Sequence, residues 1–166
     1  MSTTASVFIA TSLDGFISKP DGRIDWLHQA NAAVPPGEDC GYTQFMQTVD
    51  VLVMGRHTYE QVLTFDPWPY GERKVVVLSS RPVAIPEALA ASVVSSSEAP
   101  AALLERLGRE GARQVYVDGG KTIQGFLAEG LIQQITITVI PVLLGSGRPL
   151  FASGGKAQQL RLVSST

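Results

Sequence analysis

Short apolar runs rich in β-branched residues alternate along the chain with stretches whose apolar residues recur every three or four positions. The runs are typical of buried strands, and the wider spacing is typical of amphipathic helices. The sequence therefore predicts strands at 6–12, 16–18, 51–54, 74–78, 91–94, 112–117, 131–140 and 160–163. It predicts helical segments at 25–28, 42–49, 59–63, 97–107 and 123–127, and loops at 31–41 and 144–149.

Strands and helices alternate from one end of the chain to the other, which favours an α/β fold with helices on both faces of one sheet. No repeat, linker or change of composition divides the 166 residues, so we expect a single domain over residues 1–166. In open α/β sheets, ligands bind outside the carboxyl ends of the strands. The residues that follow each predicted strand are therefore the first candidates for function.

The composition argues against several classes of protein. Hydrophobic residues make up 45% of the chain, and the net charge is −2 with acids and bases interspersed, so neither a disordered chain nor a nucleic-acid surface is expected. No apolar run approaches the ~20 residues of a membrane span, and no basic region precedes the first apolar stretch. One cysteine, Cys40, and two histidines are too few for a disulfide or a typical zinc site. We expect a soluble cytoplasmic protein without a metal.

The most informative stretch is VYVDGGKTIQGFL, which covers residues 115–127. A strand ends at Asp118, two glycines follow, and a helical pattern begins. Adjacent glycines let the backbone approach a ligand closely, and the free N–H groups at a helix start suit a phosphate. Lys121 and Thr122 add a positive charge and a hydroxyl at the same place. A tight β–α turn without a ligand explains these residues equally well.

Two other predicted strands end in residues that suit an anion: 55–58 follows one strand, and 79–81 follows the next. Positive charge opposes the dipole at a helix start, so Arg56 and His57 favour a bound anion, most simply a phosphate. The alternatives are solvated side chains at 56–57 and ordinary turn residues at 79–80. The candidate phosphate-binding residues are Gly55, Arg56, His57, Thr58, Ser79, Ser80, Arg81, Gly119, Gly120, Lys121 and Thr122.

Two aspartates are candidates for substrate anchoring or proton delivery. Asp118 stands between a buried strand and a glycine turn, where partial desolvation can raise the pKa of a carboxyl group. A helix N-cap is an equally good explanation for Asp118. Asp14 lies in a Leu-Asp-Gly turn, where an aspartate is more often a turn-former than a catalyst.

Other nucleotide-binding and hydrolase motifs do not fit the chain. The Gly-Lys-Thr sequence at 120–122 is similar to the end of a P-loop, but that motif requires a glycine where Val115 stands inside a strand. A P-loop nucleotidase or phosphotransferase is therefore disfavoured. The six-residue glycine fingerprint of Rossmann folds and the GxSxG nucleophile elbow are both absent.

Five segments in order, spread over nearly the whole chain, resemble the dihydrofolate reductase superfamily: FIATSLDGFIS, VLVMGRHTYE, VVVLSSRP, VYVDGGKTIQGFL and ITITVIPVLLGSGRPLF. The segment MGRHTYE is similar to the cofactor corner of dihydrofolate reductases. The Asp-Gly-Gly turn and PVLLGSGRPLF are more similar to the reductase domain of the bifunctional deaminase-reductase of riboflavin biosynthesis and its stand-alone relatives. The resemblance implies a three-layer α/β/α fold around a mixed, mostly parallel sheet.

The resemblance also implies an NADPH-dependent reductase. Residues 55–58 would hold the adenosine side and the pyrophosphate of NADPH, residues 79–81 would flank the adenosine and its 2′-phosphate, and residues 119–122 would cradle the pyrophosphate. Ala10 and Ile17 match positions that line the nicotinamide. Asp118 matches an acid of the riboflavin-type reductase, whereas no acid stands near Asn31, where dihydrofolate reductases carry the carboxylate that binds the pterin.

We therefore expect hydride transfer to a small heterocyclic or ribosylaminopyrimidine-like substrate, with loop 19–41 as a candidate lid. The alternative is a nucleotide-binding module of the same fold that lacks turnover. The riboflavin-type branch further implies a homodimer formed through the exposed strand near 133–140. Neither a nucleic acid nor a membrane is an expected partner.

Overall fold

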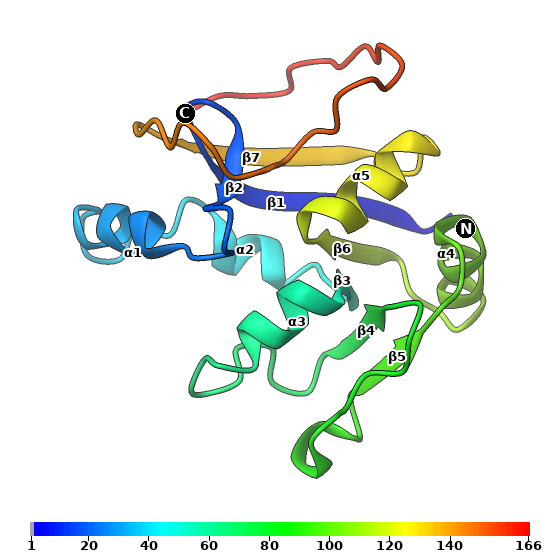
Figure 1. The fold of residues 1–166 in the computed structure, drawn as a ribbon. Coiled ribbons are helices and arrows are strands. Elements are labelled where there is room, and N and C mark those ends of the chain that lie inside the picture. The colour runs from blue at the N-terminus through cyan, green and yellow to red at the C-terminus, as the bar shows by residue number, and fades with distance from the viewer. Residues whose placement is uncertain (1) are drawn as a thin grey trace.

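A six-stranded parallel sheet forms the centre of the computed structural model, which describes residues 2–166 (Figure 1). The strands lie in the order β5-β4-β3-β6-β1-β7, and every pairing between neighbours is parallel. Their bounds are β1 Thr4–Ser12, β3 Val51–Gly55, β4 Lys74–Leu78, β5 Val93–Ser96, β6 Gln114–Asp118 and β7 Gln134–Ile140.

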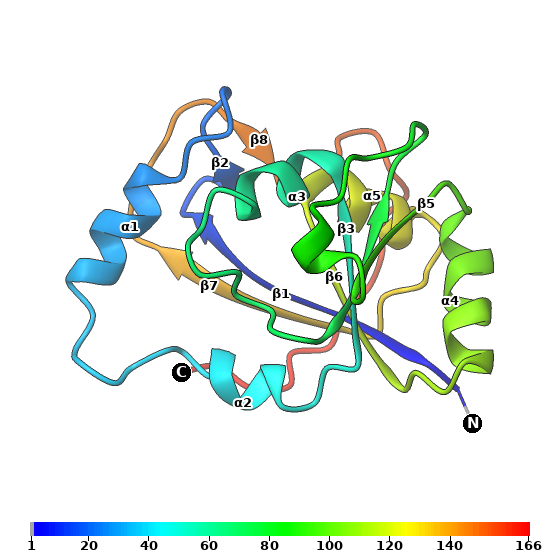
Figure 2. The ribbon, with the colours of Figure 1, turned by 90° about the horizontal axis from the view of Figure 1, so that it is seen from below.

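Helices cover both faces of the sheet, so the predicted three-layer α/β/α fold is confirmed. One face packs against α4 and α5, and the other packs against α2 and α3. Figure 2 shows α2 on the side of the sheet opposite to α5, and α1 beyond the carboxyl end of β1. The helix bounds are α1 Asp25–Ala32, α2 Tyr42–Met46, α3 Arg56–Val62, η1 Glu87–Leu89, α4 Pro100–Arg109 and α5 Gly120–Ala128.

Burial on both faces explains why the central strands are continuous apolar runs. In β4, Val75, Val76 and Val77 are all fully buried, since alternate side chains enter the two opposite cores. Helix α4 begins at Pro100, whose fixed φ suits the first turn, and buries Leu103 and Leu107 against the sheet.

Two short strands form a separate antiparallel ribbon. Strand β2 (Phe16–Ser18) pairs with β8 (Arg148–Pro149), and we call this pair the β2–β8 ribbon. The expected glycine loop at 144–149 therefore ends in a strand. Antiparallel pairing is confined to this ribbon in the described residues, which explains why the fold as a whole is mixed although the central sheet is parallel.

The predicted strand at 160–163 is wrong, because residues 151–166 contain no regular secondary structure. Leu160 and Leu162 are 74% and 80% exposed, so the apolar pattern that suggested a strand has no sheet to pack against. The outer side of β7 is also open, with Val139 54% exposed. The homodimer through this strand stays a prediction. None of the helices within residues 2–166 has the length and apolar character needed to cross a lipid bilayer.

Candidate functional site

The candidate site lies where the parallel strands end. Register pairs Gly55 with Leu78, and Met54 with Asp118, so the segments that follow β4, β3 and β6 emerge side by side at one edge of the sheet. Helices α3 and α5 both begin at this edge, directly after their strands. The structure therefore brings together the three corners that the sequence singled out.

The corners after β3 and β6 interlock through a reciprocal arrangement of glycine and threonine. A Cβ atom placed on Gly119 would lie 2.6 Å from Thr58 Oγ1, and one placed on Gly55 would lie 2.8 Å from Thr122 Oγ1. Each threonine hydroxyl thus occupies the space that a side chain on the opposite glycine would need. Gly119 also has a φ of +96°, which side-chain-bearing residues rarely adopt. The result is two helix starts that lie close together, with Gly119 buried between them.

The third corner follows β4 and is exposed. The backbone N–H of Arg81 donates to Ser79 Oγ at 3.2 Å, and the N–H of Ser79 donates to the Ser96 carbonyl at 2.9 Å. Ser79 therefore shapes the turn, while the side chain of Arg81 is left in solvent. Arg56 at the start of α3 is also exposed, and its only carboxylate neighbour in the described residues is Glu60 at 3.9 Å. Both guanidinium groups are free to meet a phosphate.

Of the two predicted nicotinamide-lining residues, Ile17 lies beside Gly120, and Ala10 lies in β1, the strand next to β6. Ile17 in β2 packs against the core beneath α5, and its Cδ1 atom lies 3.0 Å from the place of a Cβ on Gly120. Ala10 lies in β1 opposite Thr138 of β7, and it faces the same side of the sheet as Phe8. Both residues are half-buried, and Lys121 and His57 are exposed beside the helix starts.

Asp118 combines burial with access to the site. Burial of its carboxyl group raises the pKa to about 6, and the backbone N–H of Gly119, which donates to Oδ1 at 2.9 Å, partly offsets that rise. The residue as a whole is only half-buried, because it stands where β6 ends and the glycine turn begins. No side-chain hydrogen bond caps α5, so the geometry does not support the N-cap alternative for Asp118.

Aromatic side chains surround Asp118 on the face of the sheet that α2 covers. Burial raises the pKa of Tyr42 and of Tyr70, and the nearby Asp118 carboxylate raises both further, so the two phenols stay neutral. The ring of Tyr42 contacts that of Phe8 edge to face at a centroid distance of 5.7 Å. The hydroxyl of Tyr116 donates to the Phe8 carbonyl at 2.8 Å. Asp118 is thus the acid of a largely aromatic environment.

Sequence reasoning missed these tyrosines as neighbours of the site. Tyr42 opens α2, and Tyr70 lies in the proline-rich turn before β4, and neither segment follows a strand. From the sequence, residues 66–71 were expected to form a surface turn, whereas Tyr70 is buried. A tyrosine at the first position of a short helix is the one signal that could have suggested Tyr42.

The contacts of Asp14 favour the structural alternative over a catalytic role. Its carboxylate accepts hydrogen bonds from Ser12 Oγ at 2.5 Å and from the N–H groups of Leu144 and Gly145 at 3.2 and 2.8 Å. The Ser12 hydrogen bond is the main reason that its pKa is lowered. Asp14 therefore holds the loop after β7 as an ionised carboxylate, and a role in proton delivery stays a prediction without support from these contacts.

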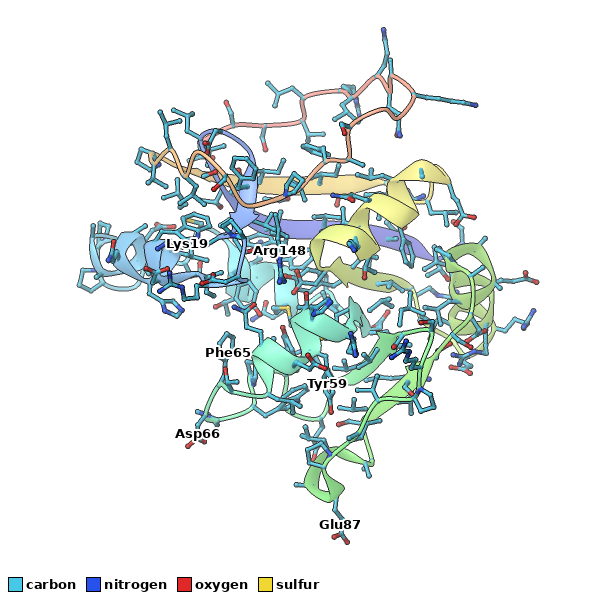
Figure 3. All side chains as sticks on the ribbon, in the orientation of Figure 1. Lys19, Tyr59, Phe65, Asp66, Glu87 and Arg148 are labelled. Carbon is cyan, nitrogen blue, oxygen red and sulfur yellow. The ribbon has the colours of Figure 1, made fainter. Side chains whose placement is uncertain are left out.

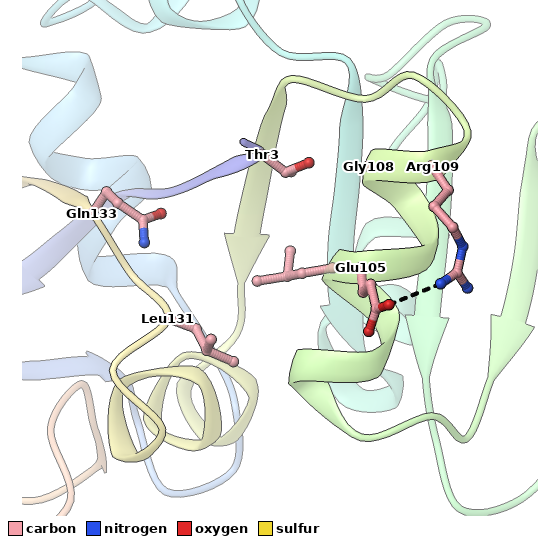
Figure 4. Close-up of a pocket in the computed structure, with 7 residues that line it drawn as sticks. Thr3, Glu105, Gly108, Arg109, Leu131 and Gln133 are labelled. Atoms are coloured by element: carbon pink, nitrogen blue, oxygen red, sulfur yellow. Dashed lines mark hydrogen bonds and ion pairs between the residues drawn. The ribbon is translucent and has the colours of Figure 1, made fainter. Parts of the chain in front are cut away.

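Two cavities lie at the opposite, amino edge of the sheet. The larger, about 430 Å³, is lined by side chains of α4 together with Thr3 and Gln133 (Figure 4). The polar groups that line it already have partners, since Glu105 pairs with Arg109 at 2.9 Å and Gln133 Oε1 accepts from the Ala5 N–H at 2.8 Å. The candidate phosphate-binding residues and Asp118 lie at the carboxyl ends of the strands, so we place the site there rather than in this cavity.

Comparison with known proteins identifies the family. The model of the RibD C-terminal domain matches residues 4–166. YwjB, an uncharacterized protein of Bacillus subtilis strain 168, is 39% identical over 159 residues, which cover 94% of this chain and 87% of YwjB. The dihydrofolate reductase HdrB of Haloferax volcanii is 33% identical over 129 residues, which cover 76% of this chain and 62% of HdrB.

Solved structures agree with the fold. A Shewanella sp. PV-4 protein that is provisionally assigned to riboflavin biosynthesis superposes with a TM-score of 0.90 at 40% identity, covering 99% of this chain and 92% of that one. The Thermotoga maritima diaminohydroxyphosphoribosylaminopyrimidine deaminase/5-amino-6-(5-phosphoribosylamino)uracil reductase superposes with a TM-score of 0.67 at 16% identity, covering 95% of this chain and 50% of that one. The second likeness concerns the fold alone. The resemblance expected from the sequence motifs is confirmed.

Proposed function

This chain belongs to the RibD C-terminal domain family, and we propose that it is an NADPH-dependent reductase for a small heterocyclic or ribosylaminopyrimidine-like substrate. A reductase-type function is the part that the family and the likeness to HdrB support directly. We propose in addition that the cofactor is NADPH and that the substrate belongs to the class named above.

The reciprocal glycine–threonine contact is the observation that carries the proposal. Cβ atoms at Gly55 and Gly119 would collide with Thr122 and Thr58, so only glycine at these two positions keeps both helix starts close together. Two adjacent helix starts present N–H groups and hydroxyls to one space, which suits a pyrophosphate. The residues present therefore fit a dinucleotide that lies across neighbouring strand ends.

Each corner has a separate part in holding such a cofactor. Thr58, Gly119 and Thr122 would bind the pyrophosphate, while Arg56 and Arg81 would meet the adenosine 2′-phosphate. Ala10 and Ile17 would form the wall beside the nicotinamide. When bound, NADPH supplies the hydride, and the protein supplies orientation and exclusion of water.

Asp118 is suited to handle the proton that a reduction of C=N or C=O requires. With a pKa of about 6 it is partly protonated near neutral pH, so it can donate a proton to the substrate or hold an amino group as a carboxylate. The neutral phenol of Tyr42 and the ring of Phe8 would offer a planar heterocycle an apolar surface beside that carboxyl group.

The test is a titration of the purified protein with NADPH, followed by absorbance of the cofactor during incubation with pyrimidine and pteridine substrates. We expect NADPH to bind and to be oxidised when one of these substrates is present. Tight binding with no oxidation by any of them would favour the alternative of a nucleotide-binding module without turnover. Absence of NADPH binding would overturn the proposal.

Arg56→Ala is expected to weaken NADPH binding by about tenfold and to leave NADH binding nearly unchanged. The guanidinium of Arg56 is proposed to meet the 2′-phosphate that NADH lacks, and one charge-assisted contact corresponds to roughly that factor. Dissociation constants from fluorescence titration of both cofactors check this result. Arg113→Ala, an exposed arginine at the amino edge of β6, is the matched control. Equal losses for both cofactors would remove this role from Arg56.

A further inference from the structure

Arg148 is a cation at the candidate site to which the sequence motifs gave no role. It lies in β8, where its backbone pairs with Ser18 of β2, and its side chain is exposed. Figure 3 labels Arg148 near the centre of the molecule, between the β2–β8 ribbon and α3. This position is far along the chain from the three corners, and only the fold brings it to them.

The guanidinium of Arg148 lies close to one turn, and hydrogen bonds from α3 and α5 fix the backbone around it. Its guanidinium atoms lie 3.3 to 3.5 Å from the place of a Cβ on Gly22, so the group rests on the backbone of the turn at 19–22. The Gly22 carbonyl in turn accepts a hydrogen bond from Gln61 Nε2 of α3 at 3.0 Å. The neighbouring Pro149 carbonyl accepts from Gln124 Nε2 of α5 at 3.0 Å, and it lies 3.3 Å from the place of a Cβ on Gly120.

The charge of Arg148 is uncompensated within the part of the chain that the structure describes. By contrast, both cations of the nearby 19–23 segment are paired: Lys19 with Asp25 at 2.8 Å, and Arg23 with Asp21 at 2.7 Å. No ion pair or side-chain hydrogen bond links the guanidinium of Arg148 to another residue of 2–166. An arginine whose planar group is oriented by packing while its N–H donors are unused is well suited to bind a phosphate.

We propose that Arg148 binds the cofactor pyrophosphate from the side of the β2–β8 ribbon, opposite the glycine corners, and is a further cofactor-binding residue. The inference rests on the proposed function, since it needs a dinucleotide at the strand ends. The sheet order decides which phosphate is contacted. Pro149, the neighbour of Arg148 in the chain, lies beside Gly120, which follows β6, whereas the 2′-phosphate is assigned to Arg56 and Arg81, which follow β3 and β4.

The test compares NADPH and NADH binding by the wild-type protein, Arg148→Gln and the matched control Arg113→Gln. Both cofactors carry the pyrophosphate, so Arg148→Gln is expected to weaken both by the same factor of about ten, whereas Arg113→Gln changes neither. Arg148→Lys keeps the charge and is expected to lose less affinity than Arg148→Gln. The salt dependence of NADPH binding should also be shallower for Arg148→Gln, which a packing defect alone would not produce.

The outcomes separate this inference from the function on which it rests. If the wild type binds NADPH and Arg148→Gln binds it equally well, Arg148 is not a cofactor ligand and the proposed function stands. A loss restricted to NADPH would place Arg148 on the 2′-phosphate and overturn the pyrophosphate assignment. If the wild type binds neither cofactor, both proposals fall together.

Discussion

Asp118→Asn is expected to lower kcat/KM for substrate reduction by about 100-fold or more while leaving the dissociation constant of NADPH unchanged. The amide keeps the size of the side chain and can still accept the hydrogen bond from the Gly119 N–H, but it cannot deliver a proton. The wild-type rate should fall as the pH rises through about 6, because the protonated fraction of Asp118 falls there. Steady-state kinetics from pH 5 to 8 on both proteins check the loss and its pH dependence.

The same variant should be more stable than the wild type at neutral pH. Because burial raises the folded-state pKa of Asp118 from 3.8 to about 6, the folded protein binds this proton more tightly than the unfolded chain does. The stability that this group contributes is therefore present below pH 4 and is lost as the pH rises to about 6. Asp118→Asn avoids that loss, which amounts to about 3 kcal/mol at pH 7.5 and to only about 0.5 kcal/mol at pH 4. A difference that does not vary with pH would contradict the burial argument.

Gly119→Ala is expected to destabilise the fold by about 3 kcal/mol and to abolish measurable NADPH binding. The new Cβ would lie 2.6 Å from Thr58 Oγ1, at a residue whose φ of +96° already disfavours a side chain. Relief of the collision would move the start of α3 away from the start of α5 and open the space between the two corners. Chemical denaturation and NADPH titration measure the two effects.

Three further variants separate backbone strain from the collision. Gly111 has a similar φ of +102°, and a Cβ on it would meet nothing within 4 Å. Gly111→Ala should therefore lower the free energy of unfolding by only about 1 kcal/mol. In the Gly119→Ala background, Thr58→Ala should recover part of the stability, whereas Thr58→Ser, which retains Oγ, should recover little. Identical behaviour of the two Thr58 variants would show that this hydroxyl is not in contact with Gly119.

Most of the fold could be predicted because local pattern and burial agree in the central strands. Residues 74–78 form a strand with the predicted bounds, since the apolar run from Val75 to Leu78 is short and lies between polar turns, as is typical of a buried strand. The predicted strand at 160–163 does not form, because there the local pattern and the burial disagree. The residues at 160–163 have a strand-like composition, but a strand also requires a hydrogen-bonded neighbour, and these residues pair with no other strand of the described chain.

In the candidate site, too, some features could be predicted from the sequence and others could not. The corners at 55–58 and 119–122 could be foreseen to meet, because each follows a parallel strand and such strands end at one edge. The loop contacts of Asp14 could not be foreseen, since its partner Gly145 is 131 residues further along the chain. The position of Arg148 over Gly22 could not be predicted either, because it depends on the pairing of β2 with β8.

The sequence by itself determined the α/β class, the glycine corners and the family, because these depend on residues that are neighbours in the chain and on backbone conformations that few residue types allow. Only the tertiary structure decided that Thr58 lies on Gly119, that tyrosines surround Asp118 and that an unpaired arginine reaches the site. The physical reason is that burial, desolvation and charge pairing arise between segments far apart in the chain, and no local pattern encodes which of them will meet.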